Sequence, residues 1–218
     1  NDTIIQEDKM VTYHKIDAVF ERDMTGNKKL IPGKFRSETV EFLANNTWIF
    51  TEKIDGTNIR VHWDGHQVEF GGRTDKAQIP PKLSEYLESV FKDNTAEELF
   101  EQKFGEADVI LFGEGYGPGI QKGGLYRDDV SFILFDVLIG DVYLKWDDVK
   151  DIAKTFGIDV VPVLGYGTIN DAVEIVKSKP MSLIGIAPME GIVARPVIGM
   201  FDRLGRRVIT KIKVRDFT

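Results

Sequence analysis

A chain of 218 residues with 42% hydrophobic content can bury one sizeable core, and it lacks both a membrane-spanning apolar run and a secretory signal, which predicts a soluble, cytoplasmic protein. The absence of cysteine excludes disulfides, thiolate metal sites and cysteine nucleophiles, and three histidines without ligand-like spacing argue against a histidine-based metal centre. The net charge of −7 argues against indiscriminate coating of nucleic acids, because that binding requires phosphate neutralisation over a broad surface.

Two runs rich in β-branched and aromatic residues predict strands at Trp48–Lys53 and Asn58–Trp63. Asp55-Gly56-Thr57 predicts a tight turn that joins these two strands as a hairpin. The second strand alternates apolar and polar residues, so one of its faces should be buried and the other should be free for chemistry. The free face would carry Asn58, Arg60 and His62.

Residues 67–71 continue this meander as a further strand. Gly71-Gly72 at its end indicates either a bulge or a close approach of the backbone to a neighbouring group. Apolar residues at helical spacing then predict a helical insertion from Pro81 to Phe104.

Near-continuous apolar runs in the second half predict two central strands, at Val109–Gly113 and Phe132–Ile139. Amphipathic helices are predicted at Trp146–Phe156 and Ala172–Val176, and the remaining strands at Val160–Leu164, Met189–Arg195 and Arg207–Arg215. This order of elements predicts an α+β fold with antiparallel sheets flanked by helices, and residues 1–218 are expected to form a single domain.

A lysine that could act as a nucleophile ends the first predicted strand, in Lys53-Ile54-Asp55-Gly56. Such a lysine must lose its proton near neutral pH, which requires burial, neighbouring positive charge, or both. On these four residues alone, an exposed lysine before an ordinary Asp-Gly turn is the better interpretation.

Three further positions are chemically suggestive. Lys211 and Lys213 lie two residues apart on a predicted strand and therefore share a face, where they could meet a triphosphate; a solvated edge strand is the alternative. Glu114, between two glycines, could be a ribose or metal ligand or a turn residue, and Glu190 poses the same choice.

The end of the chain is basic. Only Asp202 and Asp216 lie near its positive charges, so it could form a local patch, although a solvated tail is the usual outcome for a charge cluster. The basic residues are Arg203, Arg206, Arg207, Lys211, Lys213 and Arg215.

Six segments between residues 52 and 213 form an ordered set that spans most of the chain. They are Glu52–Asn58, Gly72–Thr74, Phe112–Glu114 continuing into Gly117–Lys122, Phe132–Asp136, Met189–Pro196 and Ile209–Lys213. In this order they resemble the covalent nucleotidyltransferase superfamily of ATP-dependent ligases and mRNA capping enzymes. The chain is most similar to RNA ligases of the phage RNA ligase 2 and kinetoplastid editing-ligase type, through Asn58 and Gly117–Lys122.

The resemblance implies that Lys53 is the nucleophile that carries AMP, and that Lys211 and Lys213 complete the catalytic set by holding the phosphates. It places Glu114 at the ribose, Arg73 at the ribose or phosphates, and Phe135 on the adenine ring. The full set implied for nucleotide binding is Glu52, Ile54, Asn58, Arg73, Glu114, Phe135, Glu190, Lys211 and Lys213.

The same resemblance implies a divalent cation, Mg²⁺ or Mn²⁺, with Glu190 and Asp55 as its carboxylate partners. Magnesium keeps most of its waters and uses few protein carboxylates, so contact through bound water is compatible with this set. Phage RNA ligase 2 has histidine where this chain has Asp55, whereas aspartate is common elsewhere in the superfamily. The role of Asp55 therefore cannot be copied from that relative.

The implied fold is an ATP-grasp-like nucleotidyltransferase domain without a carboxy-terminal OB or RNA-binding domain. The implied activity is an ATP-dependent RNA ligase, of the kind used in RNA repair, which forms lysyl-AMP, transfers AMP to a 5′-phosphate and seals with a 3′-hydroxyl. The expected partner is RNA with such ends, with RNA–DNA hybrids or DNA as further candidates, and we expect a monomer, with a phage gene as one candidate source.

Two alternatives remain open at this stage. A DNA ligase or an mRNA-capping guanylyltransferase would use the same lysine chemistry with another outcome. A non-catalytic nucleic-acid-binding module would retain the fold alone, although it would have no physical reason to keep three lysines facing one pocket.

Overall fold

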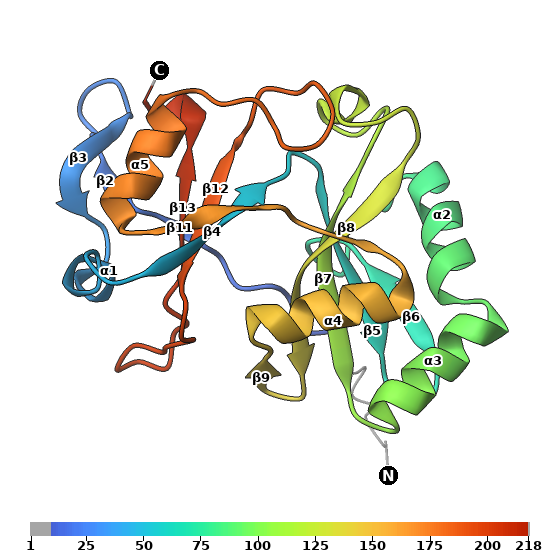
Figure 1. The fold of residues 1–218 in the computed structure, drawn as a ribbon. Coiled ribbons are helices and arrows are strands. Elements are labelled where there is room, and N and C mark those ends of the chain that lie inside the picture. The colour runs from blue at the N-terminus through green and yellow to red at the C-terminus, as the bar shows by residue number, and fades with distance from the viewer. Residues whose placement is uncertain (1–9, 218) are drawn as a thin grey trace, which may run out of the picture. The chain divides into compact units, whose positions relative to one another are not determined.

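The structure is a computed structural model that describes residues 10–217, and these residues divide into two compact units (Figure 1). Of the described residues, unit 1 contains 10–14, 57–115 and 130–159, and unit 2 contains 15–56, 116–129 and 160–217. Each unit is therefore assembled from separate stretches of the chain. That residues 1–218 form a single domain stays a prediction.

Unit 2 is built on a five-stranded sheet in the order β1-β13-β12-β4-β11. The pairs β13–β12, β12–β4 and β4–β11 are antiparallel, and the short β1 runs parallel to β13. The strands are β1 (Asp17–Ala18), β4 (Trp48–Lys53), β11 (Val163–Gly167), β12 (Gly191–Pro196) and β13 (Thr210–Lys213).

Helix α5 (Ile169–Lys177) packs on one face of this sheet and closes the core of unit 2 (Figure 1). It begins with a capping box, in which the Thr168 hydroxyl accepts from the Asp171 N–H and the Asp171 carboxylate accepts from the Thr168 N–H. Its buried residues join a cluster that includes Trp48, Phe50 and Ile192 from the sheet. The other elements are β2 (Phe20–Arg22), β3 (Leu30–Phe35), α1 (Glu38–Phe42), and the 3₁₀ turns η1 (Gly123–Leu125) and η2 (Val214–Asp216).

Unit 1 contains a six-stranded sheet in the order β10-β8-β7-β5-β6, with β9 paired to β8. The strands are β5 (Thr57–Trp63), β6 (Val68–Gly71), β7 (Val109–Tyr116), β8 (Ser131–Ile139), β9 (Val142–Tyr143) and β10 (Asp159–Val160), the last at the boundary of the unit. Its helices are α2 (Pro81–Phe91), α3 (Asn94–Phe104) and α4 (Trp146–Phe156).

Aromatic rings from the helices and strands fill the core of unit 1. The Phe100 ring lies 4.4 Å from that of Phe156 and stacks on Trp63 at 5.5 Å between centroids. Phe91 meets Phe132 edge-on at 5.6 Å, a favoured aromatic geometry. This packing explains why the predicted insertion after residue 80 is helical and covers the sheet.

The α+β fold with antiparallel sheets is confirmed, and most predicted elements lie where the sequence placed them. Strand β4 and helix α4 have the predicted bounds. The predicted helical insertion is present and consists of two helices, because the Asp93 carboxylate caps a new helix by accepting from the Ala96 N–H. The elements β1, β2, β3 and α1 were not predicted.

The predicted hairpin of β4 and β5 is wrong. The two strands belong to different sheets, and neither is paired with the other. Both edges of β4 are already occupied, by β12 on one side and β11 on the other, so no edge is left for β5. The Asp55-Gly56 turn instead leads the chain from one unit to the other.

The prediction that one face of β5 is free for chemistry is wrong for most of its length. Arg60 is 0% exposed, and His62 is 8% exposed. The Arg60 guanidinium donates to the carbonyls of Met10 and Gly72 and to the Asp75 carboxylate. The pattern of alternation did not reveal that an amino-terminal segment covers this face, and only Asn58 remains half-buried.

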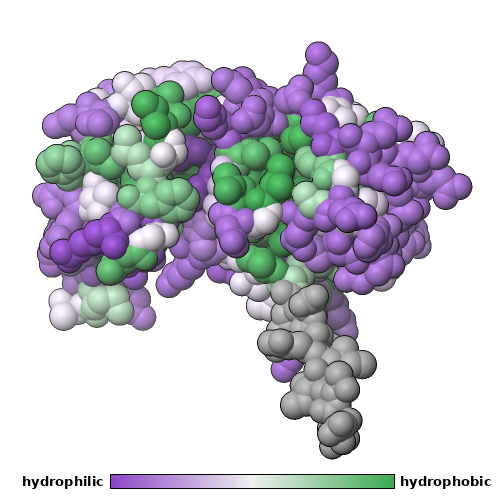
Figure 2. All heavy atoms as spheres, turned by 90° about the horizontal axis from the view of Figure 1, so that it is seen from below, coloured by the Kyte–Doolittle hydropathy of each residue, from purple (hydrophilic) through white to green (hydrophobic). Residues whose placement is uncertain are grey.

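Among residues 10–217, no helix has the length and apolar character needed to cross a lipid bilayer. Figure 2 shows hydrophobic residues reaching the surface in several places on a largely hydrophilic face. The cytoplasmic location expected from the sequence stays a prediction.

Candidate active site

The sheet of unit 2 places two of the predicted lysines in one row. Lys53 on β4 pairs with Gly191 on β12, and Gly191 in turn pairs with Lys213 on β13. Residues that are paired across neighbouring strands point to the same face of a sheet. Lys53 and Lys213 therefore share a face, with a glycine between them.

The glycine at the centre of this row is required by close packing. A Cβ atom on Gly191 would lie 2.8 Å from the Lys213 Cα and would also meet the Ile212 carbonyl oxygen. Because backbone atoms cannot rotate away as a side chain can, a larger residue would push β12 and β13 apart. Gly191 thus lets β13, which carries Lys213, pack closely against β12.

Glu190, one residue before Gly191, joins the two lysines. Its Oε2 accepts from the Lys53 Nζ at 2.8 Å, and its Oε1 accepts from the Lys213 Nζ at 2.5 Å. The side chains of Lys53, Glu190 and Lys213 are 25%, 16% and 14% exposed, so the cluster is sheltered but open to a ligand. Two ammonium groups share one carboxylate, which leaves a net positive charge.

Burial would raise the pKa of the Glu190 carboxyl, but the charges and hydrogen bonds of Lys53 and Lys213 outweigh it and lower that pKa below its usual range. Glu190 is therefore ionised at neutral pH. An ionised carboxylate between two ammonium groups can accept hydrogen bonds or contribute an oxygen to a cation, so Glu190 can serve either purpose in the site.

Lys211 lies on β13 two residues before Lys213, and its backbone pairs with Val193 of β12 and Ala18 of β1. It is half-buried and lies on the same face as Lys213, as alternation on a strand requires. All three lysines of the predicted catalytic set thus belong to one face of the unit 2 sheet.

Glu52 has a different environment from its neighbour Lys53. It is 1% exposed, and its carboxylate accepts from the Ser182 hydroxyl and, at 2.9 Å, from the Leu183 N–H. Burial raises the pKa of Glu52, and these two hydrogen bonds oppose that rise. Successive strand residues point to opposite faces, so Glu52 and Lys53 diverge. A role for Glu52 in nucleotide binding stays a prediction.

The turn after Lys53 is held by a buried tyrosine. The Asp55 N–H donates to the Tyr126 hydroxyl at 3.2 Å, and burial raises the pKa of Tyr126 to about 12. Ile54, between Lys53 and Asp55 in the chain, is 3% exposed, while Asp55 is half-buried. Tyr126 therefore remains a neutral hydroxyl that fixes the backbone beyond the lysine.

The remaining predicted residues belong to unit 1. Asn58 on β5 pairs with Glu114 on β7, so their side chains share a face of that sheet. The Asn58 Oδ1 atom is buried and accepts no hydrogen bond from the described residues. Such an atom fits a position where a ligand donor completes the bonding, since buried acceptors are seldom left unpaired.

Arg73 is exposed in the loop that follows β6. Arg60 holds the base of that loop through the Gly72 carbonyl at 2.7 Å and Asp75 at 2.9 Å. The sequence prediction of close backbone approach at Gly71-Gly72 is confirmed, because a Cβ on Gly71 would lie 2.8 Å from the Arg60 guanidinium. Arg60 was not predicted as a support for this loop.

Phe135 lies half-buried on β8 beside an aromatic residue from the amino-terminal segment. The Tyr13 ring meets the Phe135 ring edge-on at 5.1 Å, and the Tyr13 hydroxyl donates to the Asp136 carboxylate at 2.7 Å. One part of Phe135 is thus packed by protein. Its predicted stacking on adenine stays a prediction.

Among residues 10–217, no group of three or more His, Asp or Glu side chains is arranged to hold a metal ion. A magnesium ion does not need such a group, because it is commonly held by one or two carboxylates together with substrate phosphates and water. Glu190 beside the lysine row fits that kind of site. Asp55 and Glu190 as metal ligands stay a prediction.

Sequence reasoning missed the residues that support the site from a distance. Ser182 and Tyr126 each act through one contact with a residue far away in the sequence, whereas Gly191, at the centre of the lysine row, acts through close packing against β13. Neither Ser182 nor Tyr126 stands in a pattern that reports its partner, which lies 130 and 71 residues away. Gly191 could have been found, since a glycine between a carboxylate and an apolar run indicates close packing.

Comparisons with protein families and with solved structures both lead to RNA ligases. The family model described as RNA ligase matches residues 46–213. Among solved structures, an apo variant of Naegleria gruberi RNA ligase has a TM-score of 0.66, 18% identity, and covers 95% of this chain and 57% of its own. Another variant of that ligase, with ATP and Mn, has a TM-score of 0.66 and 18% identity over 93% of this chain and 56% of its own.

A third structure, the same ligase with pyrophosphate, gives a TM-score of 0.66 at 18% identity over 93% of this chain and 56% of its own. The chain spans somewhat less than three fifths of the length of these relatives, and at this identity the likeness shows the fold. No match was found among curated protein sequences. Because the family match covers the β4 lysine, the β7 and β8 segments and both lysines of β13, this chain belongs to the RNA ligase family.

Proposed function

We propose that this protein is an ATP-dependent RNA ligase that joins a 5′-phosphate end to a 3′-hydroxyl end. The observation that carries the proposal is the row of Lys53, Gly191 and Lys213 across three strands, with Glu190 bridging both amines. Membership of the RNA ligase family supplies the reaction to which this arrangement is suited.

In the first step, the Lys53 amine attacks the α-phosphorus of ATP. A phosphorus–nitrogen bond forms, the bond from that phosphorus to the oxygen of the β-phosphate breaks, and pyrophosphate leaves. The amine must be unprotonated to attack, so its proton is lost before the bond forms. Lys213 and Lys211, on the same face, offset negative charge on the phosphates.

Glu190 holds the lysine row before nucleotide binds. Its contacts at 2.8 and 2.5 Å keep both amines at defined positions near one point, which is the positioning that nucleotidyl transfer requires. A bound Mg²⁺ or Mn²⁺ would supply further positive charge against the phosphates, with Glu190 and Asp55 as the carboxylates that would hold it.

Unit 1 carries the residues proposed for the nucleoside. Glu114 and Asn58 share a face, and the buried Asn58 Oδ1 can accept a hydrogen bond from a ligand hydroxyl or amine. Arg73 is exposed and free to reach an anion, and Phe135 offers an aromatic surface. Glu52 and Ile54 are buried, so their proposed contribution is through the position of Lys53.

The two later steps regenerate the enzyme. An oxygen of the RNA 5′-phosphate attacks the phosphorus of lysyl-AMP, the phosphorus–nitrogen bond breaks, and the leaving nitrogen takes up a proton, which restores the Lys53 amine. The 3′-hydroxyl oxygen then attacks the activated 5′-phosphate, loses its proton, and AMP leaves as the phosphodiester forms. We expect a monomer to carry out all three steps, which gel filtration of the active protein would check.

Intact-protein mass spectrometry after exposure to ATP and Mg²⁺ tests the first step. We expect one AMP on the wild-type protein, located on the peptide that contains Lys53, and none on Lys53→Ala. Lys34→Ala is a matched control, because Lys34 is also paired with a glutamate, at 2.6 Å, but lies on the exposed β3. AMP on Lys53→Ala, or its absence from folded wild-type protein, would refute the proposal.

Nucleotide and substrate choice test the class of ligase. We expect label from ATP and not from GTP, and sealing of an RNA strand at a nick when either RNA or DNA is offered as the complement. Label from GTP alone would instead indicate cap synthesis, and sealing confined to DNA strands would indicate a DNA ligase.

A further inference from the structure

The loop that connects β12 to β13, residues 197–209, extends beyond the ends of both strands (Figure 1). We call it the arginine loop. Phe201 and Arg207 pair across it as an isolated bridge, and the Asp202 N–H donates to the Arg206 carbonyl at 2.8 Å. The Asp202 carboxylate accepts from the Leu204 and Arg206 N–H groups, both at 2.9 Å. These hydrogen bonds make the tip of the loop an ordered turn.

This turn exposes side chains that proteins usually bury. Ile198, Phe201 and Leu204 are 72%, 60% and 67% exposed. Arg203 is also exposed, and the Arg206 side chain is 70% exposed although it pairs with Asp202. Apolar and cationic groups displayed together on an ordered turn indicate a surface for a ligand that has both flat apolar faces and negative charge.

The carboxy-terminal stretch that contains the loop has a charge opposite to that of the rest of the chain. Residues 197–218 contain six Lys and Arg against two Asp, a net charge of +4, whereas residues 1–196 contain 22 against 33, a net charge of −11. The structure divides the basic residues: Lys213 lies in the lysine row with Lys211 on the same face of β13, and the tip of the loop carries Arg203 and Arg206. The loop thus presents a cationic surface that is separate from the lysine row.

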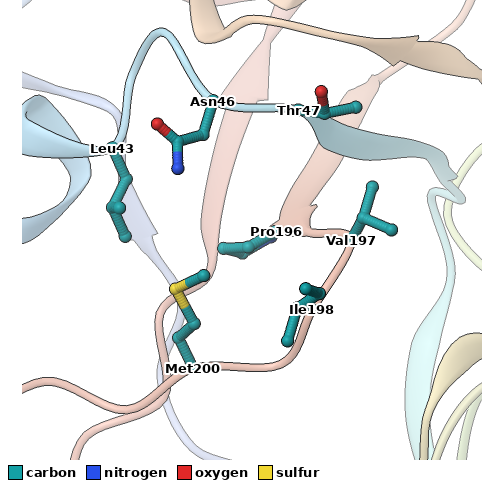
Figure 3. A pocket seen from close by; sticks show the side chains of 7 residues that line it. All are labelled: Leu43, Asn46, Thr47, Pro196, Val197, Ile198 and Met200. Atoms are coloured by element: carbon teal, nitrogen blue, oxygen red, sulfur yellow. The ribbon is translucent and has the colours of Figure 1, made fainter.

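A pocket lies at the base of the loop (Figure 3). Its volume is about 290 Å³, and it opens between the segment before β4 and the start of the arginine loop. It is lined by Leu43, Asn46, Thr47, Pro196, Val197, Ile198 and Met200. The pocket is mainly apolar, with one amide and one hydroxyl side chain, which is a lining that can accept a planar group with polar edges.

We infer that the arginine loop is an RNA-docking element, which holds the substrate strand at a distance from the reacting ends. Phe201 provides a face on which a base can stack, and Arg203 and Arg206 contact phosphates. This inference rests on the proposed function, since it supplies that reaction with a second hold on its RNA.

Strand β12 separates the base of the arginine loop from the lysine row. Five residues of β12 separate Gly191, in the lysine row, from Pro196, where the loop begins. At ~3.3 Å per residue, that separation is about 17 Å along the strand. Phe201, Arg203 and Arg206 follow Pro196 in the chain, so the loop would meet the RNA strand away from the reacting ends.

RNA fits this surface better than a protein partner does. The loop combines an exposed aromatic ring with arginines in a chain that is otherwise acidic, and a polyanion with planar bases uses both features. A second copy of this chain would bring a net charge of −7, but it would offer no regular array of planar groups.

Fluorescence anisotropy with a labelled RNA strand, without ATP, tests the inference. We expect Phe201→Ala to weaken binding about fivefold or more, which is the loss that removal of one stacked base produces. We expect Arg203→Gln with Arg206→Gln to weaken binding and to reduce the slope of log Kd against log salt by about 1.4, for two lost phosphate contacts to a single strand.

Matched controls separate the loop from general surface effects. Phe42→Ala removes an aromatic residue that is 86% exposed on α1, and Lys29→Ala removes an exposed cation before β3. Both should bind RNA as the wild type does. Circular dichroism of every variant should match the wild type, because the substituted side chains are exposed.

Three results would overturn the inference. Loop variants that bind RNA as tightly as the controls would do so, and so would wild-type protein without measurable RNA affinity. The wild-type protein could instead self-associate in sedimentation experiments. If Phe201→Ala abolished that self-association without changing RNA affinity, the loop would be a protein interface. Because ATP is absent from these measurements, their failure is distinct from failure of the wild-type protein to acquire AMP.

Discussion

At the scale of single residues, Gly191 has a role that no charged side chain of the site can replace. It separates the two strands that carry Lys53 and Lys213, and it leaves space for Glu190 to reach both amines. Gly191 therefore sets how closely β12 and β13 approach each other. A change there alters geometry without removing a charge.

We expect Gly191→Ala to destabilise the protein by about 1–3 kcal/mol, because the added Cβ meets backbone atoms that cannot move aside. The rate of AMP attachment should also fall under conditions where the variant is fully folded, since the lysine row is displaced. Urea unfolding and AMP labelling measure the two effects. Gly199→Ala is the control, because a Cβ there meets nothing within 4 Å.

The lowered pKa of Glu190 predicts how stability depends on pH. A carboxyl with a folded-state pKa below its usual 4.5 contributes stability that is fully present above that value and is lost as pH falls through the folded-state pKa. We expect Glu190→Gln to be less stable than wild type at neutral pH, and the difference to disappear in acid. A difference that persists unchanged in acid would contradict this, with Glu101→Gln on α3 as the exposed control.

Individual residues of the site were predictable where chemistry restricts the choice of side chain. The resemblance named Lys53, Lys213 and Glu190, and the structure brings them within hydrogen-bonding distance of one another. The partners of Glu52 were not predictable, because Ser182 and Leu183 reach it from a loop 130 residues away in sequence. Alternation along β5 predicted a free face that Met10 covers, since periodicity carries no information about distant segments.

At the scale of elements, α5 shows how local sequence and packing act together. Its capping box fixes the first turn, and its buried face completes the core beneath β12 and β13. The sequence indicated the helix through its apolar spacing, but placed its start three residues late, because Thr168 and Asp171 were not recognised as a cap.

We expect Thr168→Ala to cost about 0.5–2 kcal/mol, since the hydroxyl that accepts from the Asp171 N–H is lost. Each kcal/mol should lower the melting temperature by about 2–4 °C for a chain of this size. Differential scanning calorimetry measures the change. Thr155→Ala, near the end of α4, removes a hydroxyl that only bonds back to Asp151 and should change stability far less.

Strand existence was easier to predict than strand pairing. The composition of β4 and β5 identified both strands, and the Asp-Gly turn between them favoured a hairpin. Pairing depends on which edges are vacant, and β11 and β12 come from residues more than 100 positions later in the chain. No local signal reports that both edges of β4 are taken.

At the scale of the whole molecule, each compact unit is assembled from three stretches of the chain. Neither unit can complete its core from one continuous segment, so we expect the chain to unfold in a single cooperative transition, as a single domain would. Separate transitions for the two units would contradict this expectation.

The three tryptophans allow this to be measured. Trp48 reports on unit 2, while Trp63 and Trp146 report on unit 1. In Trp48→Phe, fluorescence follows unit 1 alone, and its urea midpoint should equal the midpoint of far-ultraviolet circular dichroism in the same variant. The double variant Trp63→Phe with Trp146→Phe gives the corresponding measurement for unit 2.

The central position of β4 affects how the proposed nucleophile can move. Hydrogen bonds to β12 and to the segment of Pro162 and β11 hold this strand on both sides as far as Glu52. Backbone amides in such a strand exchange with solvent among the slowest in a protein. The amine of Lys53 therefore adjusts by rotation within its own side chain. If the proposed ligation takes place there, accommodation of differently shaped RNA ends would come from surrounding loops rather than from β4.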